Sequence, residues 1–131
     1  MFLIILLIFW GCKKENIGSK IEDNKNSEVE RPKIDFAGLR ETIDNSTTMD
    51  IEVFFAISVC HKYQISQFQQ EVEGKSEEEQ KIFYLQKKND FFKSIKYTED
   101  QYNGFIDKNA NLMNEYISNH PEIAEYLIST N

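Results

Sequence analysis

Cys60 and His61 are adjacent, and a histidine beside a cysteine suggests either an activated thiol nucleophile or a metal site. Side chains of consecutive residues on a helix, however, point about 100° apart and do not face each other. His61 also falls at helical spacing among apolar residues, where a core histidine satisfied by one hydrogen bond is the commoner arrangement. We therefore expect His61 to be a core residue and Cys60 a small buried hydrophobe, neither of them catalytic or metal-binding.

Three consecutive glutamates and two asparagines are the other polar residues that could form a site. Glu77, Glu78 and Glu79 fill the first turn of a predicted helix, where they complement the positive end of its dipole, so no cation is needed to explain them. Asn89 and Asn109 each stand where the pattern expects an apolar side chain. Such an asparagine either fixes the register of a helix seam or lies where the seam meets solvent, and we favour the second interpretation.

Composition and motifs exclude several classes of function. The 131 residues carry a net charge of −7, which argues against a nucleic-acid binder. Two cysteines and two histidines are too few for a disulfide scaffold or a histidine-rich metal site. Gly-rich phosphate loops and the CxxC, HExxH, GxSxG and EF-hand patterns do not occur. We expect no catalytic residue, cofactor or metal, and keep an enzyme with an unrecognised site as the alternative.

Charge is unevenly distributed along the chain. Residues 75–98 carry six basic and four acidic side chains, whereas residues 33–74 carry three and seven, and residues 99–131 one and six. A basic helix between acidic neighbours indicates either complementarity within the molecule or a docking face for a charged partner. A solvated helix face is the simplest interpretation of its lysines, which are Lys81, Lys87, Lys88, Lys93 and Lys96.

The chain from Lys33 onward has the pattern of an all-α domain, a small bundle of four to five helices. The predicted helices are 48–73, 77–94, 99–118 and 121–129, with a short fifth at 35–43. Capping pairs mark the four main starts: Thr47 with Asp50, Ser76 with Glu79, Thr98 with Gln101, and Asn119 with Glu122. Gly74 and Pro121 separate neighbouring helices. Period-two alternation and hairpin turns are missing from the sequence, which disfavours strands.

Apolar stripes at spacings of three and four predict the buried face of each helix. The three stripes are Phe54, Ile57, His61, Ile65, Phe68 and Val72; Ile82, Leu85, Asn89 and Phe92; and Tyr102, Phe105, Asn109, Leu112 and Tyr116. One stripe can bury only one member of each adjacent pair, Phe54–Phe55 and Phe91–Phe92. The second members either pack against further helices or form an exposed aromatic binding patch.

The first residues of the chain have the composition of a targeting segment. Residues 2–10 are nine consecutive apolar residues, too few to span a bilayer, which needs about 20. Nine residues do fit the apolar core of a secretory signal, roughly 7–15 residues long. A first core helix is the alternative, but the segment lacks the 3.6-residue periodicity that a surface helix of a small domain would have.

The sequence Phe9-Trp10-Gly11-Cys12 resembles the lipobox of bacterial lipoproteins, with Gly11 and Cys12 matching and Phe9 and Trp10 replacing the usual leucine and small residue. The resemblance implies that residues 1–11 are a signal peptide cleaved after Gly11. It further implies that fatty acyl chains such as palmitate are attached at Cys12. Such a protein is anchored to a membrane of the bacterial cell envelope, and we favour the outer membrane or the surface over the inner membrane.

Residues 13–31 contain five basic and five acidic side chains, no aromatic residue and only three aliphatic ones, so we expect them to be disordered. The predicted organisation is a signal peptide (1–11), a lipidated cysteine with a flexible polar tether (12–32) and a helical domain (33–131). We expect a membrane-anchored lipoprotein that displays a helical binding or structural module, its protein partner unidentified. A secreted, non-lipidated helical protein with a Cys12–Cys60 disulfide is a further alternative.

Overall fold

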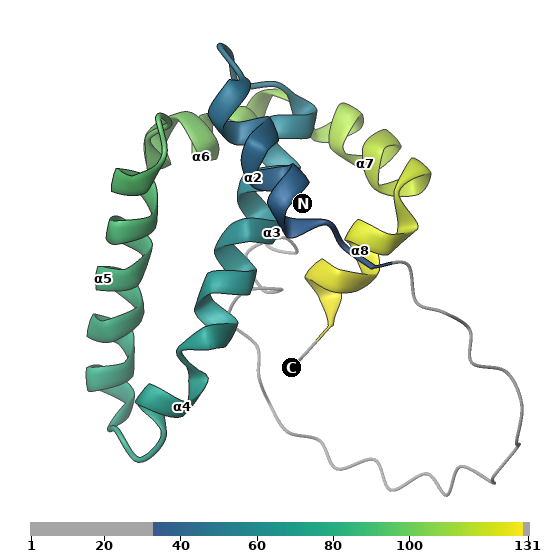
Figure 1. The fold of residues 1–131 in the computed structure, drawn as a ribbon. Helices are drawn as coiled ribbons and strands as arrows, with labels where there is room; N and C mark the ends of the chain where they lie inside the picture. Colours follow the sequence, from purple (N-terminus) through teal and green to yellow (C-terminus); the bar gives the residue numbers. More distant parts are fainter. Residues whose placement is uncertain (1–32, 130–131) are drawn as a thin grey trace, which may run out of the picture.

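The computed structural model describes residues 33–129 and confirms an all-α fold. The predicted signal peptide (1–11) and the whole of the predicted tether (12–32), Cys12 included, lie outside these residues. Within residues 33–129 there is no strand, and no helix is both long and apolar enough to cross a bilayer. The helices of Figure 1 are α2 (Phe36–Asn45), α3 (Ile51–Gln67), α4 (Gln69–Val72), α5 (Glu77–Ser94), α6 (Glu99–Lys108), α7 (Ala110–Asn119) and α8 (Pro121–Ile128).

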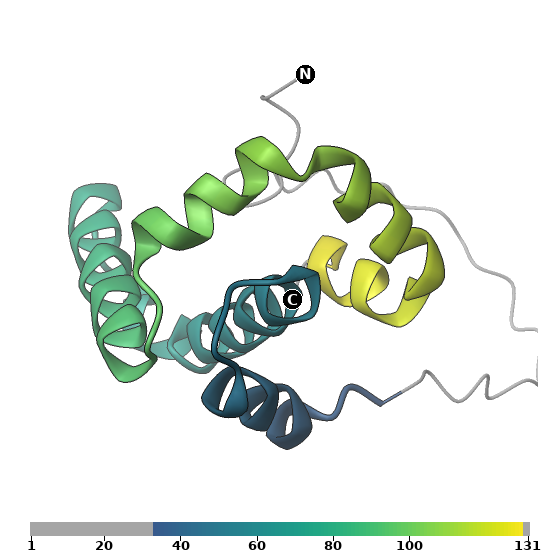
Figure 2. The same cartoon turned by 90° about the horizontal axis from the view of Figure 1, so that it is seen from above.

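Helix α3 is the centre of the molecule. Residues 53–59 are all buried, so this part of α3 has no solvent-exposed side. Helices α2, α5, α7 and α8 contact α3, and Figure 2 shows α6 and α7 arching past one side of it while α2 lies on the other. Phe54 and Phe55 are each only 2% exposed, which decides between the two alternatives left open for this pair. Both phenylalanines pack inside because helices cover both flanks of α3.

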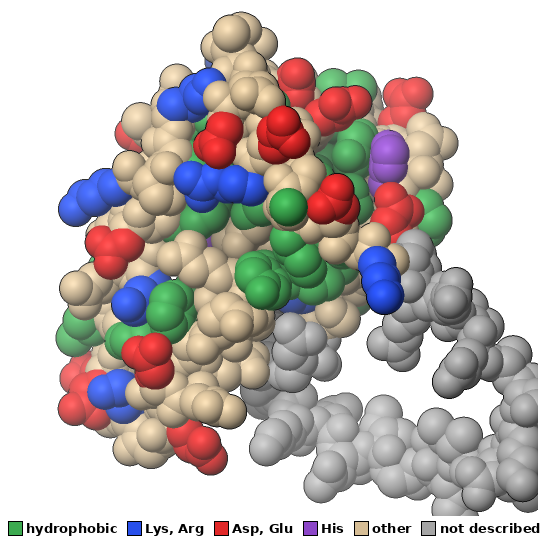
Figure 3. Space-filling view, viewed as in Figure 1, with side chains coloured by type: hydrophobic (Ala, Val, Ile, Leu, Met, Phe, Trp, Pro, Cys, Tyr) green, Lys and Arg blue, Asp and Glu red, His purple; other side chains and the backbone are tan. Residues whose placement is uncertain are grey.

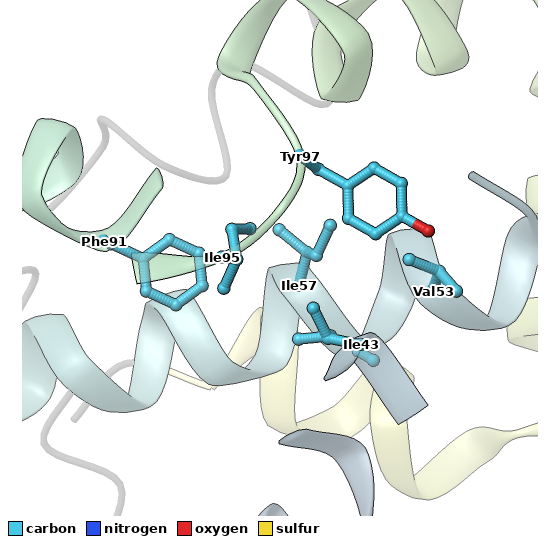
Figure 4. Packing of buried hydrophobic residues seen from close by; sticks show 7 residues of the cluster. Ile43, Val53, Ile57, Phe91, Ile95 and Tyr97 are labelled. Atoms are coloured by element: carbon cyan, nitrogen blue, oxygen red, sulfur yellow. The ribbon is translucent and has the colours of Figure 1, made fainter. Parts of the chain in front are cut away.

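Two groups of buried side chains form the core. The first joins α2, α3 and the end of α5, and Figure 4 shows Ile43, Ile57 and Ile95 converging there. The second joins α3 to α7 and α8 through Phe54, Phe55, Val59, Met113 and Ile123. Stacked rings extend this second group. The ring centroids of Phe54 and Tyr102 lie 4.6 Å apart, and those of Phe55 and Tyr116 lie 4.5 Å apart.

Local capping determines where α5 and α6 begin. Ser76 and Thr98 form the predicted capping boxes with Glu79 and Gln101, each side chain bonding the other residue's backbone amide. Gly74 has a φ of 84° in the turn before α5, a left-handed conformation that favours glycine.

The two other predicted caps are wrong. Helix α3 begins after Asp50, whose carboxylate accepts from the Val53 amide at 2.9 Å, because aspartate is itself a strong N-cap and makes Thr47 unnecessary. Helix α8 follows His120 rather than Asn119, with no side-chain cap, and Pro121 occupies its first turn as predicted. Proline lacks an amide hydrogen, so the first turn of α8 has one donor fewer to satisfy.

Two predicted helices are each divided in the structure. Helix 48–73 is interrupted at Phe68 between α3 and α4, and helix 99–118 at Asn109 between α6 and α7. The Asn109 side-chain amide donates to the Phe105 carbonyl at 2.9 Å, replacing a backbone hydrogen bond where the chain changes direction. The change in direction shifts the buried face, so Met113 is buried and Leu112, predicted to be buried, is 43% exposed.

The predicted stripe on α5 is also wrong over its first half. Ile82 and Leu85 are 67% and 54% exposed, whereas Phe91 is buried and Phe92 half-buried. In Figure 1 the first half of α5 lies beside α4 and the end of α3, and the other labelled helices lie away from it. One neighbouring layer can cover only one side of a helix, and that side carries Phe83, which packs against Phe68.

Three basic side chains bind the carboxyl ends of helices other than their own. The Arg40 guanidinium donates to the Ser94 carbonyl at 2.9 Å, at the end of α5. Lys96 donates to the carbonyls of Asp44 and Ser46 at the end of α2. Lys62, from the middle of α3, donates to three carbonyls at the end of α8. At each of these helix ends the cation binds carbonyl groups that have no hydrogen-bond donor within their own helix. Its positive charge also interacts favourably with the negative end of the helix dipole.

Candidate functional site

Cys60 lies half-buried on α3 against the first core group, as a free thiol. Burial raises the pKa of the thiol; Arg40 partly opposes this effect and Asp44 reinforces it. A thiol with a raised pKa stays protonated at neutral pH, and the protonated form is a poor nucleophile. Cys60 therefore behaves as the small packing residue that the sequence predicts, although it is half-buried rather than buried.

His61 faces α5, away from Cys60. Its ring centroid lies 5.1 Å from that of Phe91 and 6.3 Å from that of Phe92. Burial lowers its pKa to about 4, with Lys88 adding to the effect and Glu99 opposing it, so the imidazole is neutral at pH 7. The Nε2 atom is buried without a hydrogen-bond partner, whereas the sequence interpretation expected a core histidine satisfied by a hydrogen bond. The Phe91 and Phe92 rings of α5 lie beside the imidazole, and no donor or acceptor within residues 33–129 reaches Nε2.

The acidic and polar candidates occupy ordinary structural positions. Glu77, Glu78 and Glu79 fill the first turn of α5, and Glu79 closes the capping box there. Asn89 is exposed, and Asn109 caps the junction of α6 and α7. Across residues 33–129, no three side chains of the His, Cys, Asp or Glu type lie together as a potential metal site.

The lysines of the basic segment mostly make contacts within the molecule. Lys81 pairs with Glu77 at 3.3 Å and Lys88 with Glu99 at 2.7 Å. Lys87 lies over the Phe68 ring, 4.3 Å from its centroid, and Lys96 binds the end of α2. Four of the five lysines thus contact other groups of the molecule, and the Lys88–Glu99 pair joins the basic segment to an acidic neighbour, while Lys93 is exposed.

A shallow open depression of about 430 Å³ lies where α5 turns into α6. Its lining includes Asn89, Phe92 and Glu99 together with Lys93 and Lys96. The Lys96 ammonium group is already bound to backbone carbonyls, and Glu99 to Lys88. The depression therefore offers no set of free groups that converge on one point.

An aromatic cluster of Phe36, Tyr63 and Tyr126 joins the beginning of α2 to α3 and α8. The Phe36 ring stacks on the Tyr63 ring, with 4.2 Å between the ring centroids, and meets the Tyr126 ring edge-on, with 5.5 Å between the centroids. Lys62 lies over the Tyr126 ring at 5.0 Å, and Tyr63 is 42% exposed. Figure 3 shows hydrophobic side chains at the surface in this region, between the start of α2 and α8.

Sequence reasoning missed this aromatic cluster and the capping role of Lys62. The available signal was Lys62 itself, a lysine that follows the long apolar part of α3 and indicates a partner from elsewhere in the chain. Neither the cluster nor the lysine forms a reactive constellation, because their polar atoms are bound to backbone carbonyls or belong to tyrosine hydroxyls.

Cys12, the predicted lipidation site, lies outside the described residues. Compared with protein-family models, with curated protein sequences and with solved structures, the chain shows no significant match.

Proposed function

We propose that this protein is a bacterial lipoprotein, anchored to an envelope membrane through acyl chains on Cys12, that displays a helical binding or structural module. The observation that carries the proposal is the order of features at the start of the sequence. Nine apolar residues lead directly to Gly11-Cys12, and a polar segment follows. This order fits a cleaved signal with a lipidated cysteine, and the apolar segment is too short to be a transmembrane anchor.

The arrangement of the helices supports the role of a displayed module. Both described core groups join side chains of several helices within residues 33–129. Helix α2 begins at Phe36 with its own cap, Asp35, whose carboxylate accepts from the Gly38 amide at 3.0 Å. A tether ending near Lys33 can therefore hold the helices away from a membrane without disturbing their packing.

The nature of the surface supports binding rather than catalysis. The aromatic cluster presents tyrosine and phenylalanine rings, the side chains that contribute most to protein interfaces. Cys60 and His61 are held protonated and neutral, respectively, and point to different sides of α3. The module is proposed to act by contact with another macromolecule, with no nucleic acid among its partners given the net charge of −7.

Replacing Cys12 tests the anchor directly. We expect Cys12→Ala to move the protein from the detergent phase to the aqueous phase in detergent phase partitioning, because each buried acyl methylene contributes about 0.8 kcal/mol of membrane affinity. The matched control is Cys60→Ala, which removes the other cysteine and should leave the protein in the detergent phase. Retention of Cys12→Ala in the detergent phase contradicts the proposal, as does release of both variants.

A further inference from the structure

We propose that the exposed face of α5 is a docking surface for the α5 helix of a second copy of this chain, packed antiparallel. We call this face the α5 stripe and define it as Glu78, Ile82, Leu85 and Asn89. The inference concerns only the described helices, so it holds whether or not Cys12 carries lipid.

The centre of the α5 stripe carries two exposed aliphatic side chains, between the polar Glu78 and Asn89. Ile82 and Leu85 are the two large aliphatic side chains of the first half of α5, and both are more than half exposed. Helix α5 meets α3 with its opposite side, through Phe91 and through Phe83 on Phe68. In Figure 3 hydrophobic side chains lie at the surface over the lower half of α5, among acidic and basic ones.

The spacing of the α5 stripe is that of a helix seam. Glu78, Ile82, Leu85 and Asn89 follow one another at intervals of four, three and four residues, the repeat by which paired helices interlock. Among the helices of residues 33–129 the stripe has no partner helix, since the turn at Gly74 folds α5 back so that its other side meets α3 and α4. An asparagine on such a seam limits the possible registers and partners.

The distribution of charge along α5 favours antiparallel pairing with the α5 helix of a second copy. The first turn carries Glu77, Glu78 and Glu79, and the last two turns carry Asp90 and three lysines. Lys87 and Lys88 contact Phe68 and Glu99 within the molecule, and Lys93 is exposed. A parallel pair of α5 helices would place like charges together at both ends. An antiparallel pair places the acidic turn of each copy beside the basic end of the other, and two hairpins joined this way form a four-helix arrangement.

Sedimentation velocity of the full chain in a mild detergent, over a range of protein concentrations, tests the association. We expect the wild type to form a reversible dimer and Ile82→Glu with Leu85→Glu to weaken it by roughly tenfold or more per side chain, the effect of losing one buried aliphatic contact. The matched control changes two exposed aliphatic residues on other helices, Leu112→Glu with Ile128→Glu, and should dimerise like the wild type. Circular dichroism verifies that both variants remain helical.

Zero-length carboxyl–amine cross-linking of a mixture of ¹⁴N- and ¹⁵N-labelled protein tests the orientation. Intermolecular links are those that join the two isotopes, and we expect them between residues 77–79 and Lys93. A wild type that stays monomeric, or a dimer unaffected by the Ile82 and Leu85 changes, overturns the proposal. So does a monomer that binds phosphatidylcholine vesicles through these two residues, which would assign the stripe to lipid.

Discussion

The buried imidazole of His61 makes the stability of the protein depend on pH. Its pKa is about 4 in the folded chain, against an ordinary value of 6.5, so the unfolded state binds more protons between these values. Stability from this group is therefore full above pH 6.5 and is lost as the pH falls towards 4. Lys88 and Glu99 are the charged groups that act on the ring, in opposite directions.

Replacing His61 by leucine should remove this dependence. We expect the wild type to lose about 2 kcal/mol of unfolding free energy from His61 between pH 7 and pH 5, a loss that His61→Leu does not show. Urea denaturation of both proteins at the two pH values measures the difference, in which the contributions of the carboxylates cancel. Parallel pH profiles would show that His61 is solvated and that the phase of α3 is misassigned.

The hydroxyl of Tyr102 depends on a single serine inside the protein. Ser58 donates to the Phe54 carbonyl at 2.9 Å, so the Tyr102 hydroxyl, 2.7 Å away, must donate to the serine oxygen. Burial raises the pKa of Tyr102 to about 12, in keeping with a desolvated phenol. This pair ties α3 to α6.

Ser58→Ala should therefore cost about 1–3 kcal/mol, because it leaves a buried hydroxyl without an acceptor. In the Ser58→Ala background, Tyr102→Phe should cost less than it does in the wild type, since the orphaned hydroxyl is then removed as well. A double-mutant cycle measured by urea denaturation gives the coupling. Additive effects of the two substitutions would mean that the hydrogen bond is not formed.

At the scale of helices, Lys62 connects the centre of the fold to its last element. Its ammonium group donates to the carbonyls of Tyr126, Leu127 and Ser129 at the end of α8, and desolvation lowers its pKa. We expect Lys62→Met, which keeps most of the side-chain packing, to destabilise the protein by about 1–2 kcal/mol.

The loss from Lys62→Met should be concentrated in α8. Hydrogen exchange followed by mass spectrometry should show faster exchange in residues 121–129, with the matched control Lys93→Met, an exposed lysine of α5, exchanging like the wild type. Unchanged exchange in α8 would indicate that water caps its carbonyl groups equally well.

Helix identity and several helix starts were predictable from the sequence because they depend on local interactions. Ser76 and Thr98 cap helices through residues three positions away, and Gly74 marks a turn by its own backbone preference. The half-buried position of His61 followed from the stripe on α3, and that of Cys60 from its place beside the stripe. Such features require no knowledge of what lies across the fold.

The remaining errors concern features that depend on distant parts of the chain. Ile82 and Leu85 look like core residues until the fold shows that only one side of α5 is covered. The burial of Met113 instead of Leu112 follows from the change in direction at Asn109. Lys62 finds its partners more than 60 residues away, and although its charge indicates that a partner exists, no local pattern identifies the end of α8.

For the molecule as a whole, the helical domain should fold without the preceding segment. The two core groups link α2, α3, α5, α7 and α8 to one another within residues 33–129, and α5 and α6 carry their own capping boxes there. Circular dichroism of residues 33–131 should show a helical spectrum with a cooperative thermal transition. A disordered spectrum would mean that the core needs the earlier segment or a partner, since domains of this size are only marginally stable.

The central claim is that Cys12 becomes the lipidated first residue of the mature protein. The most direct test is the intact mass of the protein purified from membranes of a bacterium that produces the full chain. The account predicts a chain that lacks residues 1–11 and carries acyl chains at Cys12, with the Cys60 thiol free. A mass that corresponds to an unmodified Cys12, to retention of residues 1–11, or to a Cys12–Cys60 disulfide would contradict it.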